Sequence, residues 1–158
     1  MSIKTFVVAA TWLILASGLY YFFNAKLHPN TAEKLGAASE VSLVRDMSGH
    51  YRAEAIINGI KTPVMVDTGA TDVAISQRLA NDLGIQSSAA IRTQTANGAT
   101  VAYMTRLASV KLGGIEATNV AAIITPNLEG DMLLGMSFLS RMDVRLYKGT
   151  MTIRAAAD

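Results

Sequence analysis

The residues with the clearest chemical potential are Asp67, Thr68, Gly69 and Ala70, which directly follow the apolar run Val64–Val66. A carboxyl group can give or take a proton, so a carboxylate at the end of an apolar strand is a candidate for general acid–base chemistry. The same residues also fit an Asx-type turn that closes a strand, with Gly69 supplying permissive backbone. Taken alone, the motif leaves catalysis and a simple turn equally open.

The other residue types that carry chemistry form no convincing constellation. The chain contains two histidines, His28 and His50, and no cysteine. A nucleophilic triad would have to use His50, but no Gly-x-Ser-x-Gly motif accompanies it. Without cysteine, disulfides, thiolate catalysis and cysteine-ligated metals are excluded. Because the sequence shows no cluster of metal ligands and no phosphate-binding loop, we expect neither a metal nor a cofactor.

The charge pattern argues against nucleic-acid binding. Fourteen Lys and Arg residues stand against twelve Asp and Glu residues, which gives a formal net charge of +2. The basic residues are scattered along the chain and form no run, a pattern typical of a solvated surface.

The elements that must position Asp67 are expected to be short strands joined by tight turns. Asn-Gly between strand-like runs is a strong hairpin signal, and Gly-Gly and Lys-Gly pairs mark further turns. The expected turns are Asn58-Gly59, Asn97-Gly98, Gly113-Gly114 and Lys148-Gly149. The expected strands are His50–Ile57, Thr62–Val66, Val101–Leu112 and Ala117–Ile124.

Two stretches carry helical spacing instead. Ser76 is placed to cap a short helix that runs through Leu83 and is closed by Gly84. The segment Met136–Met142 is expected to form a second short helix. The folded domain is therefore predicted to be mostly β with one or two short helices.

The order of these motifs resembles that of the retropepsin-like aspartic proteases, and most closely the bacterial, singly anchored members. The resemblance covers about a hundred residues, over which a hairpin, the catalytic motif, a strand and short helix, a flap hairpin and a final apolar-Gly motif follow one another. The corresponding residues are Asn58-Gly59, Asp67-Thr68-Gly69-Ala70, Val73–Gly84, Thr95–Thr100 and Leu133-Leu134-Gly135-Met136-Ser137-Phe138-Leu139.

This resemblance implies a closed, mostly β acid-protease fold in which Asp67 is the catalytic residue. In such enzymes two carboxylates share a proton, and the pair activates a water molecule for attack on a peptide bond. The chain has only one Asp-Thr-Gly motif, and it is too short for a second lobe. The second carboxylate is therefore expected from another copy of the chain, which predicts a homodimer with a two-fold axis through the site.

The resemblance also assigns supporting roles. Thr68 is expected to lock the two active-site loops together across the dimer, and Gly69 to support the site and contact the substrate backbone. Ala70 is expected to line the adjacent substrate pocket. Asn97 and Gly98 are expected to form the tip of a flap that folds over a peptide or protein substrate and excludes water.

The N-terminal region reads as a membrane anchor followed by a tether. Thr5–Phe23 is an uncharged apolar run long enough to cross a bilayer as a helix. A cleaved signal peptide, with Ala16-Ser17-Gly18 as the cleavage site, is the competing interpretation, and a buried core helix is a third. The predicted organisation is an anchor at residues 1–23, a tether at residues 24–40 and a protease domain at residues 41–158.

Together these observations predict a membrane-anchored, homodimeric aspartic endopeptidase without a metal or other cofactor. The resemblance to bacterial anchored members places it in the inner membrane with the catalytic domain in the periplasm. The alternative from another functional class is a non-catalytic, membrane-tethered peptide-binding or dimerisation module on the same fold. An intact Asp-Thr-Gly-Ala argues against this alternative, because an isolated buried carboxylate is costly to desolvate.

Overall fold

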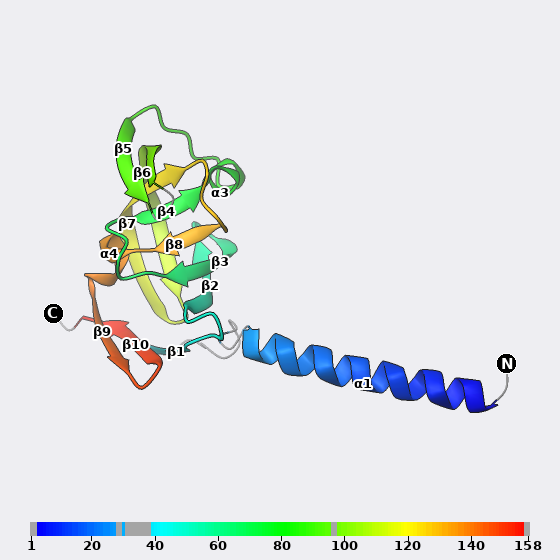
Figure 1. Ribbon diagram of the computed structural model, residues 1–158. Coiled ribbons are helices and arrows are strands. Elements are labelled where there is room, and N and C mark those ends of the chain that lie inside the picture. The colour runs from blue at the N-terminus through cyan, green and yellow to red at the C-terminus, as the bar shows by residue number, and fades with distance from the viewer. Residues whose placement is uncertain (1–2, 28–29, 31–38, 96–97, 157–158) are drawn as a thin grey trace.

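The computed structural model describes residues 3–27, 30, 39–95 and 98–156. These residues form a long N-terminal helix and a β-rich domain (Figure 1). The helix is α1 (Ile3–Leu27), and the domain contains β1 (Glu40–Val44), β2 (Tyr51–Ile57), β3 (Ile60–Val66), β4 (Val73–Ser76), α3 (Gln77–Asp82), β5 (Ala90–Thr95), β6 (Gly98–Leu112), β7 (Ile115–Thr125), β8 (Met132–Leu134), α4 (Met136–Leu139), β9 (Met142–Tyr147) and β10 (Thr150–Ala155).

The domain consists of one closed sheet and one small open sheet. The larger sheet has seven strands in the order β2-β3-β8-β4-β7-β6-β5, and an additional pairing of β2 with β6 closes it. Most of its pairs are antiparallel, but β3 pairs with β8 and β4 with β7 in parallel. The smaller sheet has the order β1-β10-β9. The mostly β, closed fold expected from the sequence is confirmed, whereas the smaller sheet was not foreseen.

Three of the four glycine-containing pairs that the sequence predicted as turns, Asn58-Gly59, Gly113-Gly114 and Lys148-Gly149, join paired strands in the described part of the chain. Asn58 and Gly59 join β2 to β3 with φ angles of 47° and 89°. Lys148 and Gly149 join β9 to β10 with φ angles of 45° and 79°. Two successive positive φ angles are typical of the type I′ turn, whose twist matches that of paired strands.

One predicted helix is confirmed and the other is shorter than predicted. Ser76 caps α3, and its side-chain oxygen accepts a hydrogen bond of 3.1 Å from the backbone N–H of Leu79. The second helix, α4, ends at Leu139, so the predicted helical segment Met136–Met142 is wrong in its last turn. Met142 instead begins β9, because it pairs with Ala155 of β10.

The hydrophobic core fills the closed sheet through the alternation of each strand. In β3, Thr62, Val64 and Val66 are buried, whereas the residues between them are exposed or half-buried. Phe138 and Leu139 of α4 are also buried and pack into the same core. Asp67 therefore directly follows Val66, the last buried residue of a strand that is anchored in the core.

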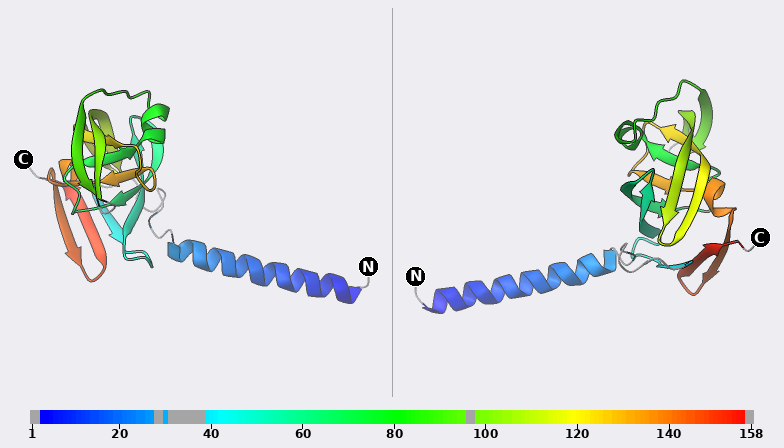
Figure 2. Two further views of the ribbon diagram at one scale, coloured as in Figure 1. Left: turned by 45° about the horizontal axis from the view of Figure 1, so that its top comes forward. Right: turned by 180° about the vertical axis from the view of Figure 1, so that it is seen from behind.

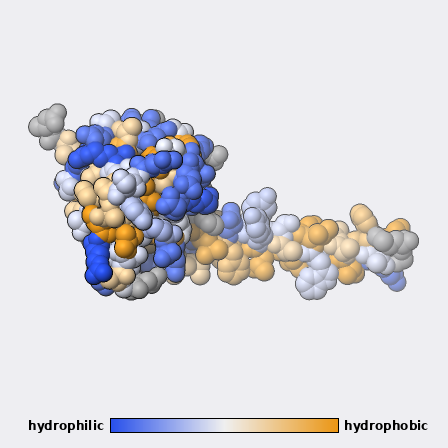
Figure 3. Space-filling model, turned by 90° about the horizontal axis from the view of Figure 1, so that it is seen from above, coloured by the Kyte–Doolittle hydropathy of each residue, from blue (hydrophilic) through white to orange (hydrophobic). Residues whose placement is uncertain are grey.

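Helix α1 differs from the domain in that none of its residues is buried. Its 25 residues are long and apolar enough to cross a membrane. Figure 2 shows it extending away from the domain in two further views, and Figure 3 shows apolar side chains along its length. The absence of buried residues in α1 contradicts the interpretation as a buried core helix and leaves the anchor and the signal peptide as alternatives.

A buried carboxylate organises the loop between β1 and β2. The Asp46 side chain is only 4% exposed and forms an ion pair of 3.1 Å with Arg52. It also accepts hydrogen bonds from the backbone N–H groups of Ser48 and His50 and from the Ser48 hydroxyl. Burial alone would raise the pKa of Asp46, but these hydrogen bonds and the Arg52 charge outweigh it, so its pKa is lowered.

Asp46→Asn should therefore destabilise the domain in a pH-dependent way. A carboxylate with a lowered pKa contributes stability above its unfolded pKa of about 3.9 and loses it as the pH falls through the folded pKa. At pH 7 we expect a loss of about 1–3 kcal/mol, because hydrogen bonds to a charged group are replaced by weaker ones. Thermal unfolding of the full chain in detergent should show a lower Tm for the variant than for the wild type at pH 7, and this difference in Tm should be smaller at pH 3.

The matched control for this prediction is Asp82→Asn. The side chain of Asp82 is 55% exposed, and its ion pair with Arg78 lies on the surface of α3. Such a pair contributes little to stability, so the Tm of this variant should stay near that of the wild type at both pH values. An equal loss of stability from Asp46→Asn at pH 7 and pH 3 would contradict the proposed role of the ionised carboxylate.

Candidate active site

Asp67 lies directly after β3, and its backbone and side chain are both held in place. Its backbone N–H donates a hydrogen bond of 3.2 Å to the carbonyl of Leu134 in β8. Its carboxylate oxygen Oδ1 accepts a hydrogen bond of 2.8 Å from the N–H of Gly69. The N–H of Ala70 donates to the Asp67 carbonyl over 3.3 Å. The turn that sequence analysis offered as an alternative is therefore present, and it fixes the direction of the carboxylate.

The loop that carries Asp67 rests on Gly135, at the junction of β8 and α4. A Cβ atom at Gly135 would lie 2.2 Å from the carbonyl oxygen of Asp72 and 2.8 Å from that of Ala70. No side chain fits against backbone at these distances, so only glycine permits this approach. The next residue, Met136, donates its N–H to the Ala70 carbonyl over 2.8 Å. The first turn of α4 thus supports the loop from behind.

Ser137 is a further supporting residue that sequence analysis did not identify. Its hydroxyl donates to the carbonyl of Ala121 in β7 over 2.7 Å and accepts from the N–H of Val73 over 2.9 Å. Its backbone N–H also donates to the Thr71 carbonyl over 2.9 Å. Ser137 therefore ties α4, β7 and the start of β4 together. Its signal in the sequence was a single polar residue within the apolar run Leu133–Leu139.

The residues of the loop differ in exposure. Asp67 and Ala70 are half-buried, whereas Thr68 and Gly69 are exposed. Among the described residues, Asp67 forms no ion pair, so its carboxylate oxygens are open to a bound molecule apart from the Gly69 hydrogen bond. A half-buried, unpaired carboxylate on a fixed loop can serve as an acid or a base toward a ligand.

Of the two predicted flap residues, the structure describes only Gly98. Gly98 begins β6, is half-buried and has a φ of 104°, which favours glycine. It pairs with Thr95 of β5 at the end of a hairpin that Figure 1 shows projecting from the closed sheet. Asn97 lies outside the described residues. Among the described residues, no hydrogen bond joins Gly98 to Asp67, Gly69 or Ala70.

A cavity of about 900 Å³ lies elsewhere on the domain. It is lined by residues of β2, β3 and the 129–132 segment, together with Asn24 and Asn30, and Asp67 is not among them. This cavity is therefore separate from the Asp67 loop. Among the described residues, no group of three or more His, Asp or Glu side chains is arranged to hold a metal ion.

Comparison with known proteins identifies relatives of this domain. Residues 53–141 match the model of the family described as "gag-polyprotein putative aspartyl protease". The chain is 31% identical over 109 residues to an uncharacterized protein in the cobV 5′ region of a Sinorhizobium species, covering 66% of this chain and 47% of that one. It is 31% identical over 146 residues to an uncharacterized protein of Rickettsia prowazekii, covering 84% and 62% respectively. The chain thus spans about half to three fifths of these curated relatives.

Solved structures give the same result. The crystal structure of a retropepsin-like aspartic protease from Rickettsia conorii matches with a TM-score of 0.66 and 32% identity, covering 73% of this chain and 90% of that one. EIAV protease in complex with the inhibitor HBY-793 matches with a TM-score of 0.50 and 17% identity, covering 60% and 88%. The second likeness shows the fold alone.

Proposed function

The chain belongs to the retropepsin-like aspartic protease family, and from this premise we propose that it is a membrane-anchored, homodimeric aspartic endopeptidase with Asp67 as its catalytic residue. The observation that carries the proposal is the Asp67 carboxylate, which is half-buried, unpaired among the described residues and oriented by the Gly69 N–H. Sequence analysis had predicted both the family and the fold, and both are confirmed.

The proposed reaction uses the two Asp67 carboxylates of a dimer. Two carboxylates about 3 Å apart cannot both ionise, so they share one proton and titrate as a pair. The ionised member takes a proton from a water molecule, which attacks the peptide carbonyl, while the protonated member donates a hydrogen bond to the carbonyl oxygen. The proton then passes to the leaving amine as the carbon–nitrogen bond breaks.

The neighbouring residues have supporting roles in this proposal. Gly69 orients the Asp67 carboxylate through its N–H and, being exposed, offers its backbone to a substrate chain. The exposed Thr68 is available to meet its counterpart from a second copy. Ala70 lines the adjacent pocket, and Asn97 and Gly98 form the flap tip. An extended peptide between loop and flap suits backbone pairing of the kind that an added strand makes.

The free edge of β9 is the surface that best fits a second copy. Among the described strands, β9 pairs only with β10, so its outer edge is open. Leu146 of β9 lies opposite Met151 of β10, which lies opposite Leu43 of β1. These three cross-strand neighbours share one face of the sheet. Leu43 is 0% exposed and Met151 is 2% exposed, but Leu146 is 57% exposed. The apolar row on this face of the sheet therefore ends in a residue, Leu146, that a single chain leaves exposed to solvent.

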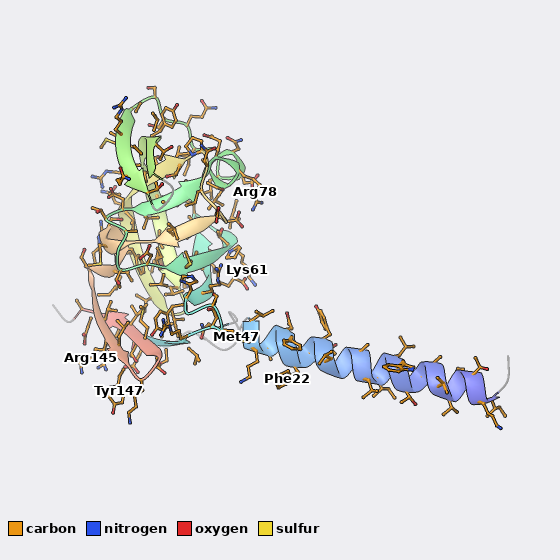
Figure 4. The ribbon with its side chains drawn as sticks, in the orientation of Figure 1. Phe22, Met47, Lys61, Arg78, Arg145 and Tyr147 are labelled. Carbon is orange, nitrogen blue, oxygen red and sulfur yellow. The ribbon has the colours of Figure 1, made fainter. Side chains whose placement is uncertain are left out.

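The position of β9 links this edge to the active site. Met136, which donates to Ala70 of the Asp67 loop, begins α4, and β9 follows α4 at Met142. Figure 4 shows Arg145 and Tyr147 of β9 at the end of the domain remote from Arg78. Antiparallel pairing of two β9 edges would cover Leu146 and extend the three-stranded sheet across a two-fold axis.

Leu146→Glu should therefore shift the chain toward monomers. A charged side chain would have to be desolvated at the proposed interface, and two such charges would face each other across the axis. We expect sedimentation in detergent to show a dimer dissociation constant raised by at least about tenfold. Peptide cleavage should fall in parallel at low protein concentration. The control is Ile60→Glu, which replaces a 39% exposed residue at the β2–β3 turn. Equal dimer strength in both variants would contradict the proposed interface.

The anchor and location are part of the same proposal. Helix α1 is apolar and unburied, which suits a single-pass anchor at residues 1–23, followed by a tether at residues 24–40 and the protease domain at residues 41–158. The relatives in Rickettsia and Sinorhizobium support a bacterial setting. We place α1 in the inner membrane and the domain in the periplasm. The orientation can be tested with a reporter that is active only in the cytoplasm, fused to the C-terminus of the chain. Activity of this fusion would contradict a periplasmic domain.

The test of the proposed function is cleavage of a diverse peptide library by the full chain in detergent, read by mass spectrometry. A shared-proton dyad works in mildly acidic solution, so the assay should cover about pH 4 to 7. Defined cleavage products would support the endopeptidase. If a confirmed dimer cleaves no peptide over this pH range, the result would favour the alternative, a non-catalytic peptide-binding or dimerisation module.

A further inference from the structure

Asn30 fastens the chain to the domain soon after α1 ends. It is 6% exposed, although most of its neighbours in sequence lie outside the described residues. Its side-chain N–H group donates to the carbonyls of Val44 over 2.9 Å and of Arg52 over 2.8 Å. Its side-chain oxygen accepts from the N–H of Val44 over 2.7 Å. A buried amide with three hydrogen bonds to two strands is a fixed attachment, which we call the Asn30 latch.

The latch joins the two sheets at the point where the helix reaches the domain. Val44 ends β1 in the smaller sheet, and Arg52 lies in β2 of the larger one. Asn24 of α1 lines the same cavity as Arg52 and Met65, so the last turn of the helix also lies beside the domain. In Figure 4, Met47 of the β1–β2 loop appears at this junction. The Asn30 hydrogen bonds and the cavity that Asn24 lines therefore both place the end of α1 beside β2.

The shortest connection from the helix to Asp67 combines peptide bonds, one hydrogen bond and one strand pairing. Leu27 and Asn30 are three peptide steps apart, which span at most about 11 Å. The hydrogen bond from Asn30 to Arg52 brings their Cα atoms within about 9 Å. Arg52 pairs directly with Met65 at a Cα separation of about 5 Å, and Asp67 lies about 7 Å further along the chain.

These limits place the catalytic carboxylate close to the end of the apolar span. Counting also the helix between Phe23 and Leu27, which adds about 6 Å, Asp67 cannot stand more than about 40 Å from Phe23. This is the length of about a dozen extended residues. Without the latch, the chain between Leu27 and Glu40 alone could reach about 45 Å, and the domain would add its own width.

We propose that the Asn30 latch restricts the enzyme to substrates whose scissile bond lies within about a dozen residues of the membrane that holds α1. The substrate class is the juxtamembrane segments of other membrane-anchored proteins. The inference rests on the proposed protease activity and on α1 as a retained anchor. It follows because a dimer whose two copies are latched in this way keeps its dyad within about 40 Å of the ends of its membrane spans, and a peptide bond further out does not meet it.

The experiment reconstitutes the full chain in liposomes with single-span reporter proteins. Each reporter carries a cleavage sequence selected from the peptide library, separated from its span by a proline-rich spacer of 6 or 24 residues. Such spacers are semi-rigid and extend by about 3.1 Å per residue, which places the sequence about 19 Å or about 74 Å from the bilayer. We expect the short-spacer reporter to be cut at least about tenfold faster, in line with the loss of effective concentration for a site out of reach.

Two variants distinguish the effect of the latch on substrate preference from an effect on folding. Asn30→Ala removes the side-chain hydrogen bonds, and an insertion of 30 Gly and Ser residues after Leu27 lengthens the connection while Asn30 is kept. Both should reduce the preference for the short spacer to about twofold or less. A soluble peptide with the same cleavage sequence should be cut at the wild-type rate by every variant that folds.

The outcomes are distinct. Equal cleavage of both reporters by the wild-type chain, or an unchanged preference in the insertion variant, would overturn the proposed restriction while the protease itself stands. Failure of the wild-type chain to cut the soluble peptide would overturn the proposed function, and the restriction with it. Loss of peptide cleavage in Asn30→Ala alone would mark a folding defect, and the insertion variant would then decide.

Discussion

Replacing Asp67 by asparagine is expected to lower kcat for peptide cleavage by about 10³-fold or more while the chain still folds and dimerises. The amide has nearly the shape of the carboxylate but cannot accept the proton of the attacking water. General acid–base groups commonly contribute 10²- to 10⁴-fold to a rate, and this substitution removes both members of the proposed dyad. The asparagine side chain would keep an oxygen to accept the Gly69 N–H, so the loop should hold its conformation.

Asp82→Asn is the matched control for the Asp67 variant, because it removes an exposed carboxylate from α3. We expect it to cleave the selected peptide at the wild-type rate. Circular dichroism and sedimentation would verify the fold and dimer of both variants. Substantial cleavage by Asp67→Asn, in a preparation free of wild-type chain, would exclude Asp67 as the catalytic base and turn attention to the binding-module alternative.

The shared dyad gives a second readout of the same variant. If each active site needs Asp67 from two copies, random pairing of equal amounts of wild-type and Asp67→Asn chains leaves about a quarter of the dimers with two carboxylates. Activity should therefore fall to about a quarter of that of the same total amount of wild-type dimer. A fall to one half would show that each chain works with its own carboxylate alone.

Much of the fold was predictable because its signals are local. The Asn58-Gly59 and Lys148-Gly149 turns each need two positive φ angles, which few other residue pairs adopt readily. Ser76 marked the start of α3 because a side-chain oxygen before an apolar, helix-spaced segment satisfies a free N–H. The position of Asp67 after β3 followed from the apolar run that precedes it.

The parts that were missed depend on contacts between distant residues. The alternation of β1 is clear only once Val41 and Leu43 are known to lie opposite Ile153 and Met151. Without that pairing, nothing local distinguishes β1 from the end of a tether. The last turn of the predicted second helix failed for the same reason, because pairing with Ala155 draws Met142 into β9. Asn30 gave no signal at all, since its role is defined by the carbonyls of Val44 and Arg52.

The candidate site shows the same division. The Asp67 to Ala70 motif could be found in the sequence, but its support could be found only in part. Gly135 was recognised as part of the final apolar-Gly motif. The reason for the glycine, the close approach of its backbone to the carbonyls of Asp72 and Ala70, depends on the folded structure. Ser137 was missed because its partners, Ala121 and Val73, lie far away along the chain.

Gly135→Ala should damage both stability and activity. The new Cβ would lie 2.2 Å from the Asp72 carbonyl oxygen and 2.8 Å from the Ala70 oxygen, distances at which the backbone must move. Overpacking in a fixed interior typically costs about 1–3 kcal/mol, and a clash between backbone atoms lies at the upper end of that range. The loop that moves carries Asp67, and a displacement of about 1 Å at a catalytic group can cost about 10²-fold in rate.

Gly59→Ala separates this clash from the ordinary cost of replacing glycine. Gly59 has a φ of 89°, and a Cβ there would meet nothing within 4 Å. The strained backbone alone should lower stability by about 1–2 kcal/mol, and cleavage should stay near the wild-type rate because the β2–β3 turn is remote from Asp67. Thermal unfolding and kcat should be measured for both variants. Wild-type kcat in a folded Gly135→Ala chain would show that the Asp67 loop does not depend on this contact, because the clash would then have been relieved by movement of α4 instead.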